Sequence, residues 1–177
     1  MYLQTTTSIL RPWLASDAEA VARHANNPRV AAGMRDAFPH PYTLEDAHRF
    51  IERAPGAGNL FLAIEVKGEA MGGIGIHVLD DVYCRTGEIG YWLSESCWGQ
   101  GITAEAVRAL VPVVFRTTDL VRIQAGIFSC NPASARVLEK CGFVREAVLK
   151  DAITKNGVVM DEIVYAILKK QVGESDG

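Results

Sequence analysis

A short glycine-rich stretch gives this chain its clearest chemical signal. Gly99 and Gly101 stand two residues apart in Ser96-Cys-Trp-Gly-Gln-Gly-Ile-Thr-Ala-Glu-Ala106, between a strand-like run and a helix-like run. Glycine adopts positive φ easily, and it lets a backbone approach a ligand closely. We expect Thr103 to cap the following helix, whose first N–H groups then point into the loop. Aligned amides at the positive end of a helix dipole form an anion site suited to a pyrophosphate.

Three interpretations of this loop are open. The spacing Gly99-Gln-Gly101-Ile-Thr-Ala104 satisfies the dinucleotide fingerprint G-x-G-x-x-G/A. That fingerprint requires an acidic residue near the end of the next strand, where this chain has Phe128-Ser-Cys-Asn131, and its fold normally starts with a parallel βαβ unit. The other interpretations are a site for coenzyme A and a turn that binds nothing. The missing acid disfavours the dinucleotide.

A second polar helix start follows the next strand. Asn131 suits an N-cap, Pro132 suits the first helical position, and Gly142 suits the position just after the helix. Ser134 lies three residues from Asn131, at the same end of the helix, although serine is a weaker helix former. Helix capping explains the first three residues, and it does not explain Ser134.

The elements that position these residues alternate along the chain. Ser16 with Glu19, and Thr43 with Asp46, resemble capping boxes at two helix starts, the first ending near Asn26 and the second at Ala54-Pro-Gly. We expect an irregular loop at 30–41 that borders a substrate site. Period-two patterns predict strands at 8–13, 60–66, 70–79, 84–93, 121–128, 143–149 and 158–168, with helices at 103–118 and 132–141. The sum is a mixed α/β sheet with helices on both faces.

Length and composition limit the class of protein. The 177 residues fit one domain, with a core at about 8–168 and a frayed tail at 173–177. The net charge of −3 does not indicate a partner such as nucleic acid or an anionic membrane. The chain starts without a secretory signal and has no apolar run of membrane-spanning length, so we expect a cytoplasmic protein. Its four cysteines and four histidines lack metal-ligand spacing, so no metal is expected.

Three motifs in order make the resemblance specific. The stretches Glu88-Ile-Gly-Tyr-Trp-Leu93, Trp98-Gly-Gln-Gly-Ile-Thr-Ala-Glu-Ala106 and Asn131-Pro-Ala-Ser134…Glu139-Lys-Cys-Gly-Phe143 resemble the GNAT superfamily of N-acetyltransferases. More narrowly, they resemble its ribosomal-protein-alanine acetyltransferase-like branch, and the likeness covers roughly residues 8 to 168. The loop departs from the superfamily pattern at Thr103, where glycine or alanine is usual.

The resemblance implies a GNAT-type fold in which the fourth and fifth strands of a mostly antiparallel sheet splay apart. It implies acetyl-CoA as cosubstrate and direct transfer of its acetyl group to a primary amine. Leu93 would meet the pantetheine arm, and Asn131 and Ser134 would flank the arm and its sulfur. The pyrophosphate would lie on the amides of Gly99, Gln100, Gly101, Thr103 and Ala104.

Direct transfer needs a base for the amine and a proton for the leaving thiolate. Glu88 is the first candidate base, because a carboxylate in mid-sheet is costly unless it is paired or used. The alternatives for Glu88 are a wet strand edge or an ion pair with an arginine such as Arg85. The proton for the thiolate could come from Ser134 or from a tyrosine.

Two further residues are candidates on the substrate side. His77, on the adjacent strand, is the second candidate base or a substrate contact, although a lone strand histidine is more often structural. Asp161 is a candidate contact for the substrate ammonium, and a solvated strand start is its ordinary interpretation.

The acceptor stays open between a protein N-terminus, a polyamine-like or aminoglycoside amine, and an amino acid. The alternative function is a non-catalytic module that binds or senses acyl-CoA on the same fold. Dimers are common in this branch, so a homodimer is expected by analogy.

Overall fold

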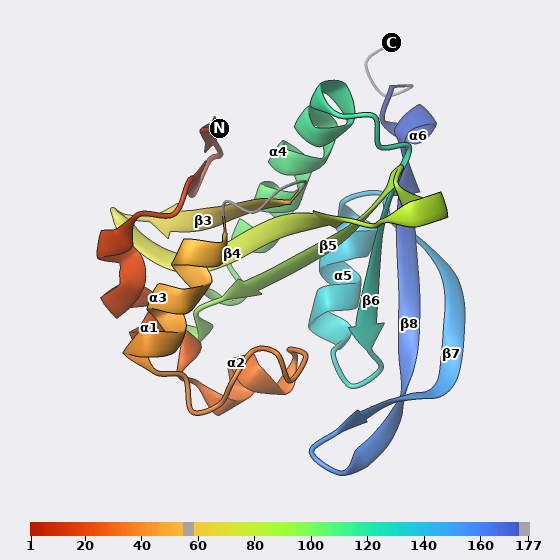
Figure 1. Ribbon diagram of the computed structural model, residues 1–177. Helices are drawn as coiled ribbons and strands as arrows, with labels where there is room; N and C mark the ends of the chain where they lie inside the picture. The colour runs from red at the N-terminus through yellow and green to blue at the C-terminus, as the bar shows by residue number, and fades with distance from the viewer. Residues whose placement is uncertain (55–58, 174–177) are drawn as a thin grey trace.

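The computed structural model describes residues 1–54 and 59–173, and its strands form one eight-stranded sheet in the order β1-β2-β3-β4-β5-β6-β8-β7. The strands are β1 (Leu3–Gln4), β2 (Ile9–Arg11), β3 (Leu60–Val66), β4 (Glu69–Val78), β5 (Thr86–Leu93), β6 (Arg122–Phe128), β7 (Val144–Lys155) and β8 (Val158–Leu168). The helices are α1 (Ala18–Ala25), α2 (Pro28–Ala32), α3 (Leu44–Arg53), α4 (Ile102–Thr117), α5 (Pro132–Lys140) and α6 (Lys169–Gly173). The predicted mixed sheet with a helical layer on each face is confirmed (Figure 1).

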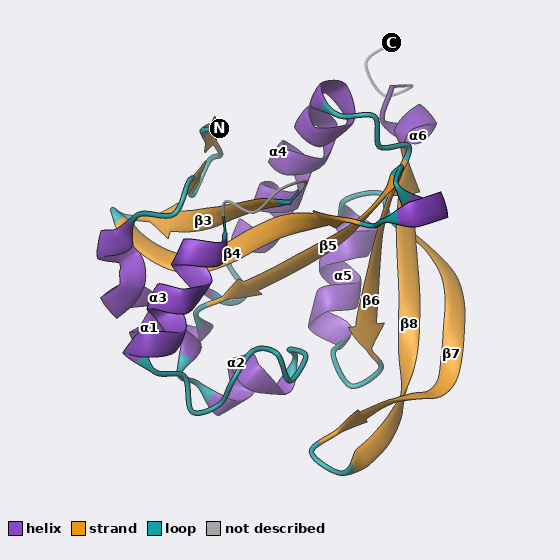
Figure 2. Cartoon of the chain, in the orientation of Figure 1, coloured by secondary structure: helices purple, strands orange, loops and turns teal. Residues whose placement is uncertain are grey.

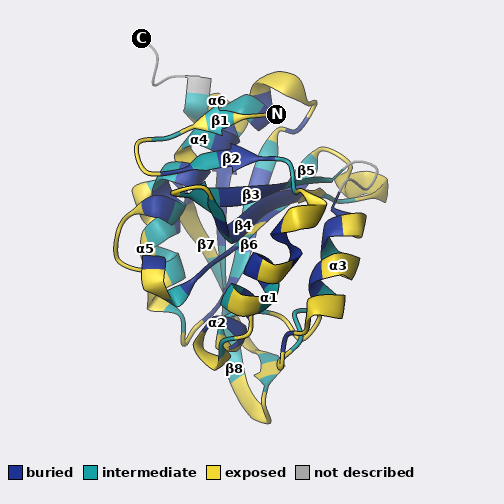
Figure 3. Cartoon of the chain, turned by 90° about the vertical axis from the view of Figure 1, so that its left-hand side faces the viewer, coloured by how far each residue is buried: buried dark blue, intermediate teal, exposed yellow. Residues whose placement is uncertain are grey.

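The two faces of the sheet bury separate cores. Ile89 and Leu93 of β5 belong to the larger core, together with apolar residues of α4 and α5. Trp92, the alternate residue, belongs to the smaller core with α1 and α3. Figure 3 shows the buried side of α1 turned towards the sheet and the exposed side turned away. Strand alternation therefore decides which face each β5 side chain serves.

The neighbouring strands β5 and β6 are paired at one end and separate at the other. They form a parallel pair in which Thr86, Gly87 and Glu88 face Arg122, Ile123 and Gln124. Beyond Glu88, no further residue of β5 is in register with β6 within the described strands, and the two ribbons diverge (Figure 2). The predicted splay is thus confirmed, and it starts directly after Glu88.

The start of α1 corrects one prediction. Ser16 does not cap this helix and forms no capping box with Glu19, because a 3₁₀ turn at Ala15–Asp17 precedes α1. Asp17 instead accepts the Leu14 N–H at 2.8 Å. The same carboxylate accepts two hydrogen bonds from Arg11, at 2.8 and 2.9 Å. The buried Arg11 guanidinium on β2 therefore fixes this turn through Asp17, where the local sequence predicted a helix cap at Ser16.

Other boundaries differ where tertiary contacts extend an element. The capping box of Thr43 and Asp46 is confirmed at α3, while Pro55 and Gly56 lie outside the described residues. The predicted loop at 30–41 starts with the end of α2, whose N-cap Asn27 accepts the Arg29 N–H. Strand β7 runs on to Lys155 rather than ending at Leu149, because two register shifts let it stay paired with β8. Of the predicted frayed tail, residues 174–177 also lie outside the description.

Replacing Asp17 with asparagine should destabilise the fold strongly. The Arg11–Asp17 pair is buried, with 8% of each side chain exposed, and the change leaves the guanidinium with Glu65 as its remaining carboxylate partner among the described residues. We expect the free energy of unfolding to fall by about 1.5–3 kcal/mol in urea titration, the range for lost hydrogen bonds to a charged group. The control Glu45→Gln, in an exposed pair with Arg49, should change it by less than about 1 kcal/mol. Equal effects of the two variants would contradict this role.

The same pair predicts how stability depends on pH. Burial alone would raise the pKa of Asp17, but hydrogen bonds from Arg11 and the Leu14 N–H outweigh it and lower that pKa. A lowered pKa means that the contribution is present above the ordinary aspartate range and is lost as the pH falls through the folded-state value. Asp17→Asn should therefore flatten the acid limb of the stability profile measured by thermal melting.

Candidate functional site

The glycine loop leads directly into α4. Gly99 and Gly101 have φ of 76° and 80°, and a β-carbon placed on either would meet nothing within 4 Å. Backbone conformation, rather than lack of space, therefore requires glycine at both positions. Gly101 itself is the N-cap of α4, without a side-chain hydrogen bond. The prediction that Thr103 caps the helix is wrong, because the left-handed turn at Gly101 starts the helix at Ile102.

The amides of this loop are available to a ligand. Glu105 is the first residue of α4 whose N–H donates back along the chain, to the Gly101 carbonyl at 3.0 Å. None of the N–H groups from Gly99 to Ala104 has an acceptor among the described residues. The Gln100 side chain is engaged elsewhere, donating to the Ser96 carbonyl at 3.0 Å. A row of amides without an internal acceptor, at the start of a sixteen-residue helix, fits a phosphate-bearing ligand.

Leu93 ends β5 beside this loop. Its side chain is buried in the core, and its carbonyl accepts the Trp98 indole N–H at 2.9 Å. Arg29 lies over the exposed Trp98 ring, 5.3 Å from the ring centroid. The sequence indicated Leu93 as a contact for the coenzyme arm, and the structure positions it at the open end of the splay.

The first turn of α5 lies on the other side of the splay. Asn131 Oδ1 accepts the Ser134 N–H at 3.1 Å, so the predicted N-cap is confirmed. The Ser134 hydroxyl lies 2.8 Å from the Tyr91 hydroxyl, which comes from β5. Burial raises the pKa of Tyr91 to about 12, so the phenol is neutral near pH 7. The structure thus brings Asn131, Ser134 and a tyrosine together.

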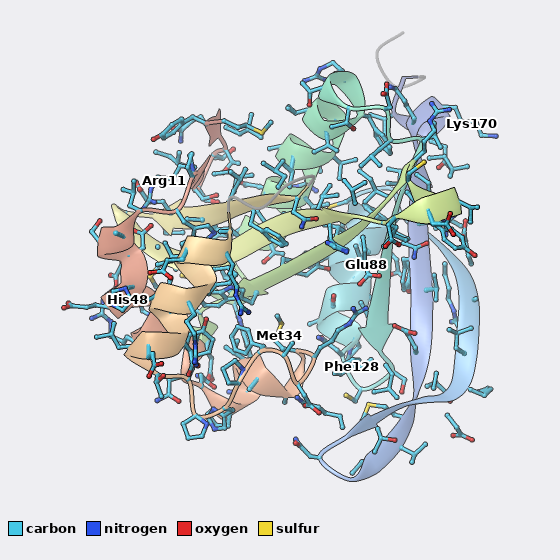
Figure 4. The ribbon with its side chains drawn as sticks, viewed as in Figure 1. Arg11, Met34, His48, Glu88, Phe128 and Lys170 are labelled. Atoms are coloured by element: carbon cyan, nitrogen blue, oxygen red, sulfur yellow. The ribbon has the colours of Figure 1, made fainter. Side chains whose placement is uncertain are left out.

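A pocket of about 230 Å³ lies between the segment after α2 and the β7–β8 hairpin. Its walls include Arg35, Asp36, Phe128, Lys155 and Glu162. Figure 4 shows Glu88 on β5, near the point where β5 and β6 separate, and Phe128 at the far end of β6. The pocket therefore lies at the Phe128 end of β6, and Arg35 connects its wall to Glu88.

Two ion pairs hold the segment after α2 across this region. Arg35 contacts the Glu88 carboxylate at 2.6 Å, and the next residue, Asp36, contacts Lys155 Nζ at 2.6 Å. Of the two alternatives to a base, the structure shows an ion pair with an arginine, and that arginine is Arg35, because Arg85 donates to the Asp119 carbonyl instead. The role of Glu88 as base stays a prediction. Glu88 remains 27% exposed, so a ligand can reach it once Arg35 moves.

Glu162 is a site residue that sequence reasoning missed. In the antiparallel β6–β8 pair it faces Phe128, and its carboxylate lies over Gly126, where a β-carbon would come within 2.1 Å of Oε1. It has no ion pair or hydrogen bond to the described residues. The signal in the sequence was a glycine in β6 whose missing side chain leaves room for a carboxylate, which is visible only once the register is known.

Of the two predicted substrate contacts, Asp161 lies away from this group and His77 lies beside Glu88. Asp161 is adjacent to Glu162 on β8, so its side chain points to the opposite face of the sheet. Its carboxylate accepts from Lys150 Nζ at 2.8 Å and from the Asp151 N–H, and the lysine lowers the pKa of Asp161. His77 faces Glu88 across the β4–β5 register, and its ring Nδ1 lies 2.7 Å from Asn59 Oδ1. Roles for both residues stay predictions.

The described residues contain no group of three or more histidine, cysteine, aspartate or glutamate side chains that could hold a metal ion. A membrane-crossing helix is likewise absent from this part of the chain.

Comparison with known proteins identifies relatives of this arrangement. The Acetyltransferase (GNAT) domain family matches residues 8–144. The Bacillus subtilis (strain 168) protein YoaA, an uncharacterised N-acetyltransferase, is 33% identical over 180 residues, covering 94% of this chain and 96% of that protein. The ribosomal-protein-serine acetyltransferase of Escherichia coli (strain K12) is 39% identical over 82 residues, 46% of each chain. The solved structure of Mycobacterium smegmatis RimJ in complex with CoA-disulfide has 25% identity and a TM-score of 0.81, covering 97% of this chain and 88% of that one.

This chain therefore belongs to the GNAT acetyltransferase family and is an acetyl-CoA-dependent N-acetyltransferase. The predicted fold, family branch and cosubstrate are confirmed, and nothing in these relatives favours a non-catalytic module. The amides of Gly99 to Ala104 fit a pyrophosphate in number and in having no internal acceptor among the described residues.

Gly101→Ala should weaken binding of coenzyme A. A non-glycine residue at φ near 80° is strained by about 1–2 kcal/mol, so the loop should relax and its amides should lose their alignment. We expect the dissociation constant from calorimetry to rise roughly tenfold. Gly157→Ala is the matched control, because Gly157 has φ of 77°, equally open surroundings and a position in the β7–β8 hairpin. If both variants bind equally, the loop is not the coenzyme site.

Proposed function

We propose that this enzyme acetylates the α-amine of a protein N-terminus. One relative, 39% identical over 82 residues, carries the name of a ribosomal-protein-serine acetyltransferase. The pocket between the segment after α2 and the β7–β8 hairpin opens to the surface, as a chain that continues outward would require.

The charge balance of the pocket is the observation that carries this proposal. Arg35 is matched by Glu88, and Lys155 is matched by Asp36. Glu162 is left as the wall carboxylate without a partner in the described residues. One unmatched carboxylate suits a ligand with a single cationic amine, because each further cation in a polyamine or aminoglycoside would lack a counterpart. The free carboxylate of an amino acid would likewise lack a cationic partner in the pocket.

The pocket volume supports the same class of acceptor. About 230 Å³ accommodates one or two small residues, and Phe128 and Ile153 provide an apolar wall. The remainder of a peptide would stay outside. An uncharged first side chain therefore fits this space better than a charged one.

We assign the coenzyme to residues on both sides of the splay. The amides of Gly99, Gln100, Gly101, Thr103 and Ala104 would hold its phosphates, and Leu93 and Asn131 would border its arm. Acetyl-CoA supplies a thioester whose sulfur leaves as a thiolate and takes up a proton.

On the acceptor side, the proposed roles divide between two carboxylates and a hydroxyl. Glu162 would bind the ammonium form of the acceptor. Glu88, released from Arg35, would accept the proton that the amine must lose before it reacts. Ser134 would hold the proton that the sulfur requires, at its Oγ.

A panel of acceptors tests the proposed substrate class. Thiol release should follow addition of short peptides with a free N-terminus and an uncharged first residue. The same peptides with an acetylated N-terminus are the control and should give none. Polyamines, aminoglycosides and free amino acids should react at least tenfold more slowly as judged by kcat/KM. A polyamine or aminoglycoside that outperforms every peptide would contradict the proposal.

Amide variants separate the two carboxylates. Glu88→Gln should lower kcat roughly 100-fold at neutral pH with little change in the acceptor KM, because it removes the base. Glu162→Gln should mainly raise the acceptor KM, because it removes uniform binding of the amine. Glu19→Gln, an exposed change of equal charge on α1, should alter neither constant. Wild-type kcat in Glu88→Gln would rule out the proposed base.

A further inference from the structure

Tyr91 is a partly buried titratable residue to which the proposed mechanism assigns no role. It lies on β5 and turns towards α5, on the same face as Ile89 and Leu93. Its hydroxyl lies 2.8 Å from Ser134 Oγ and 3.4 Å from the Ser134 carbonyl oxygen. The other titratable group that affects it is the Cys141 thiol of the α5 C-terminus. A phenol in an apolar core needs a partner, and Ser134 provides it.

The contact between Tyr91 and Ser134 lies beyond the end of the β5–β6 ladder. The ladder between β5 and β6 ends at Glu88, and Tyr91 comes three residues later, where β5 has separated from β6. The Tyr91–Ser134 contact therefore joins β5 to the first turn of α5 at a level where the sheet does not join β5 to β6. It lies within the splay, where the sequence resemblance puts the sulfur.

Two contacts define the position and the orientation of Ser134. Its N–H is held by Asn131 Oδ1 at 3.1 Å, which fixes the backbone of the first turn. Its hydroxyl has one proton and two lone pairs, and the phenol lies within hydrogen-bonding distance of one side of it. When the phenol donates to Ser134 Oγ, the serine proton must point to another acceptor.

We propose that Tyr91 is a positioning residue for Ser134: its phenol donates to Ser134 Oγ and so directs the serine proton into the splay, towards the leaving sulfur. This inference rests on the proposed role of Ser134. The net reaction moves one proton from the acceptor nitrogen to the sulfur. Ser134 gives its proton to the sulfur. The amine gives a proton to Glu88, and Glu88 passes a proton back to Ser134 through water. Tyr91 keeps its own proton throughout, because burial raises its pKa to about 12.

A double-mutant cycle tests this dependence. Ser134→Ala should lower kcat roughly 100-fold, and Tyr91→Phe should lower it roughly tenfold with the KM for acetyl-CoA unchanged. The double variant should match Ser134→Ala, because the phenol acts only through the serine hydroxyl. In a Ser134→Thr background, which keeps a hydroxyl, Tyr91→Phe should again lower kcat. Multiplicative losses in the double variant would overturn the inference.

The second measurement does not depend on activity. Replacing Tyr91 with 3,5-difluorotyrosine makes the phenol more acidic, so its ionisation can be followed by absorbance at a pH the fold tolerates. When the phenol ionises, the Ser134 hydroxyl donates to the phenolate oxygen and so lowers the pKa of Tyr91; Ser134→Ala should therefore raise the titration midpoint. Ser96→Ala, whose hydroxyl contacts Ser94, is the control and should leave the midpoint unchanged. An unchanged midpoint in Ser134→Ala would overturn the contact.

The outcomes separate this inference from the proposed mechanism. Wild-type kcat in Ser134→Ala would remove the proposed role of Ser134, and the positioning role of Tyr91 would fail with it. A slow Ser134→Ala beside an unimpaired Tyr91→Phe would overturn only the inference about Tyr91.

Discussion

The parallel pairing of β5 and β6 stops after Glu88 and Gln124, and the functional site is arranged around this interruption. Two neighbouring strands that separate leave backbone N–H and C=O groups facing a gap, and such groups need partners. An open sheet edge inside a folded protein is consequently a place where a ligand can take the position of a strand. The glycine loop, the α5 N-terminus and the segment after α2 all border this gap.

Much of this arrangement could be predicted from local sequence, because it depends on local physics. The Asn131 cap, the Pro132 start and the left-handed Gly142 follow from side-chain and backbone preferences within a few residues. The strand alternation that separates Trp92 from Ile89 needs only the period of two. Where a nearby side chain outside the capping pattern competed, the prediction was wrong. Ser16 lost its expected role to an aspartate held by Arg11 of β2.

The proposed acceptor side could not be predicted, because its residues come from positions far apart in the chain. Arg35 lies in an irregular segment, and its partner Glu88 is 53 positions later in the chain, so no pattern connects them. Glu162 is recognisable only from the β6–β8 register, which puts Gly126 beneath its carboxylate. Arg35 and Asp36 are consecutive and bind opposite walls, one on β5 and the other on β7. Movement of this one segment would release both pairs together, which couples access to the pocket to the availability of Glu88. The homodimer expected by analogy remains a prediction.

The glycine loop has a consequence for how such a protein can diverge. A surface built from main-chain amides is specified by conformation, and most side chains in the loop do not take part in it. Gln100 turns back to the Ser96 carbonyl, and Trp98 turns to the Leu93 carbonyl, so both stabilise the shape of the loop. If the loop holds the cosubstrate as proposed, substitutions that preserve the two left-handed glycines can accumulate without loss of binding. The proposed acceptor pocket is built from charged side chains, so a single substitution would change its selectivity. The proposed coenzyme loop therefore tolerates most side-chain substitutions, whereas the proposed acceptor pocket changes its selectivity after few of them.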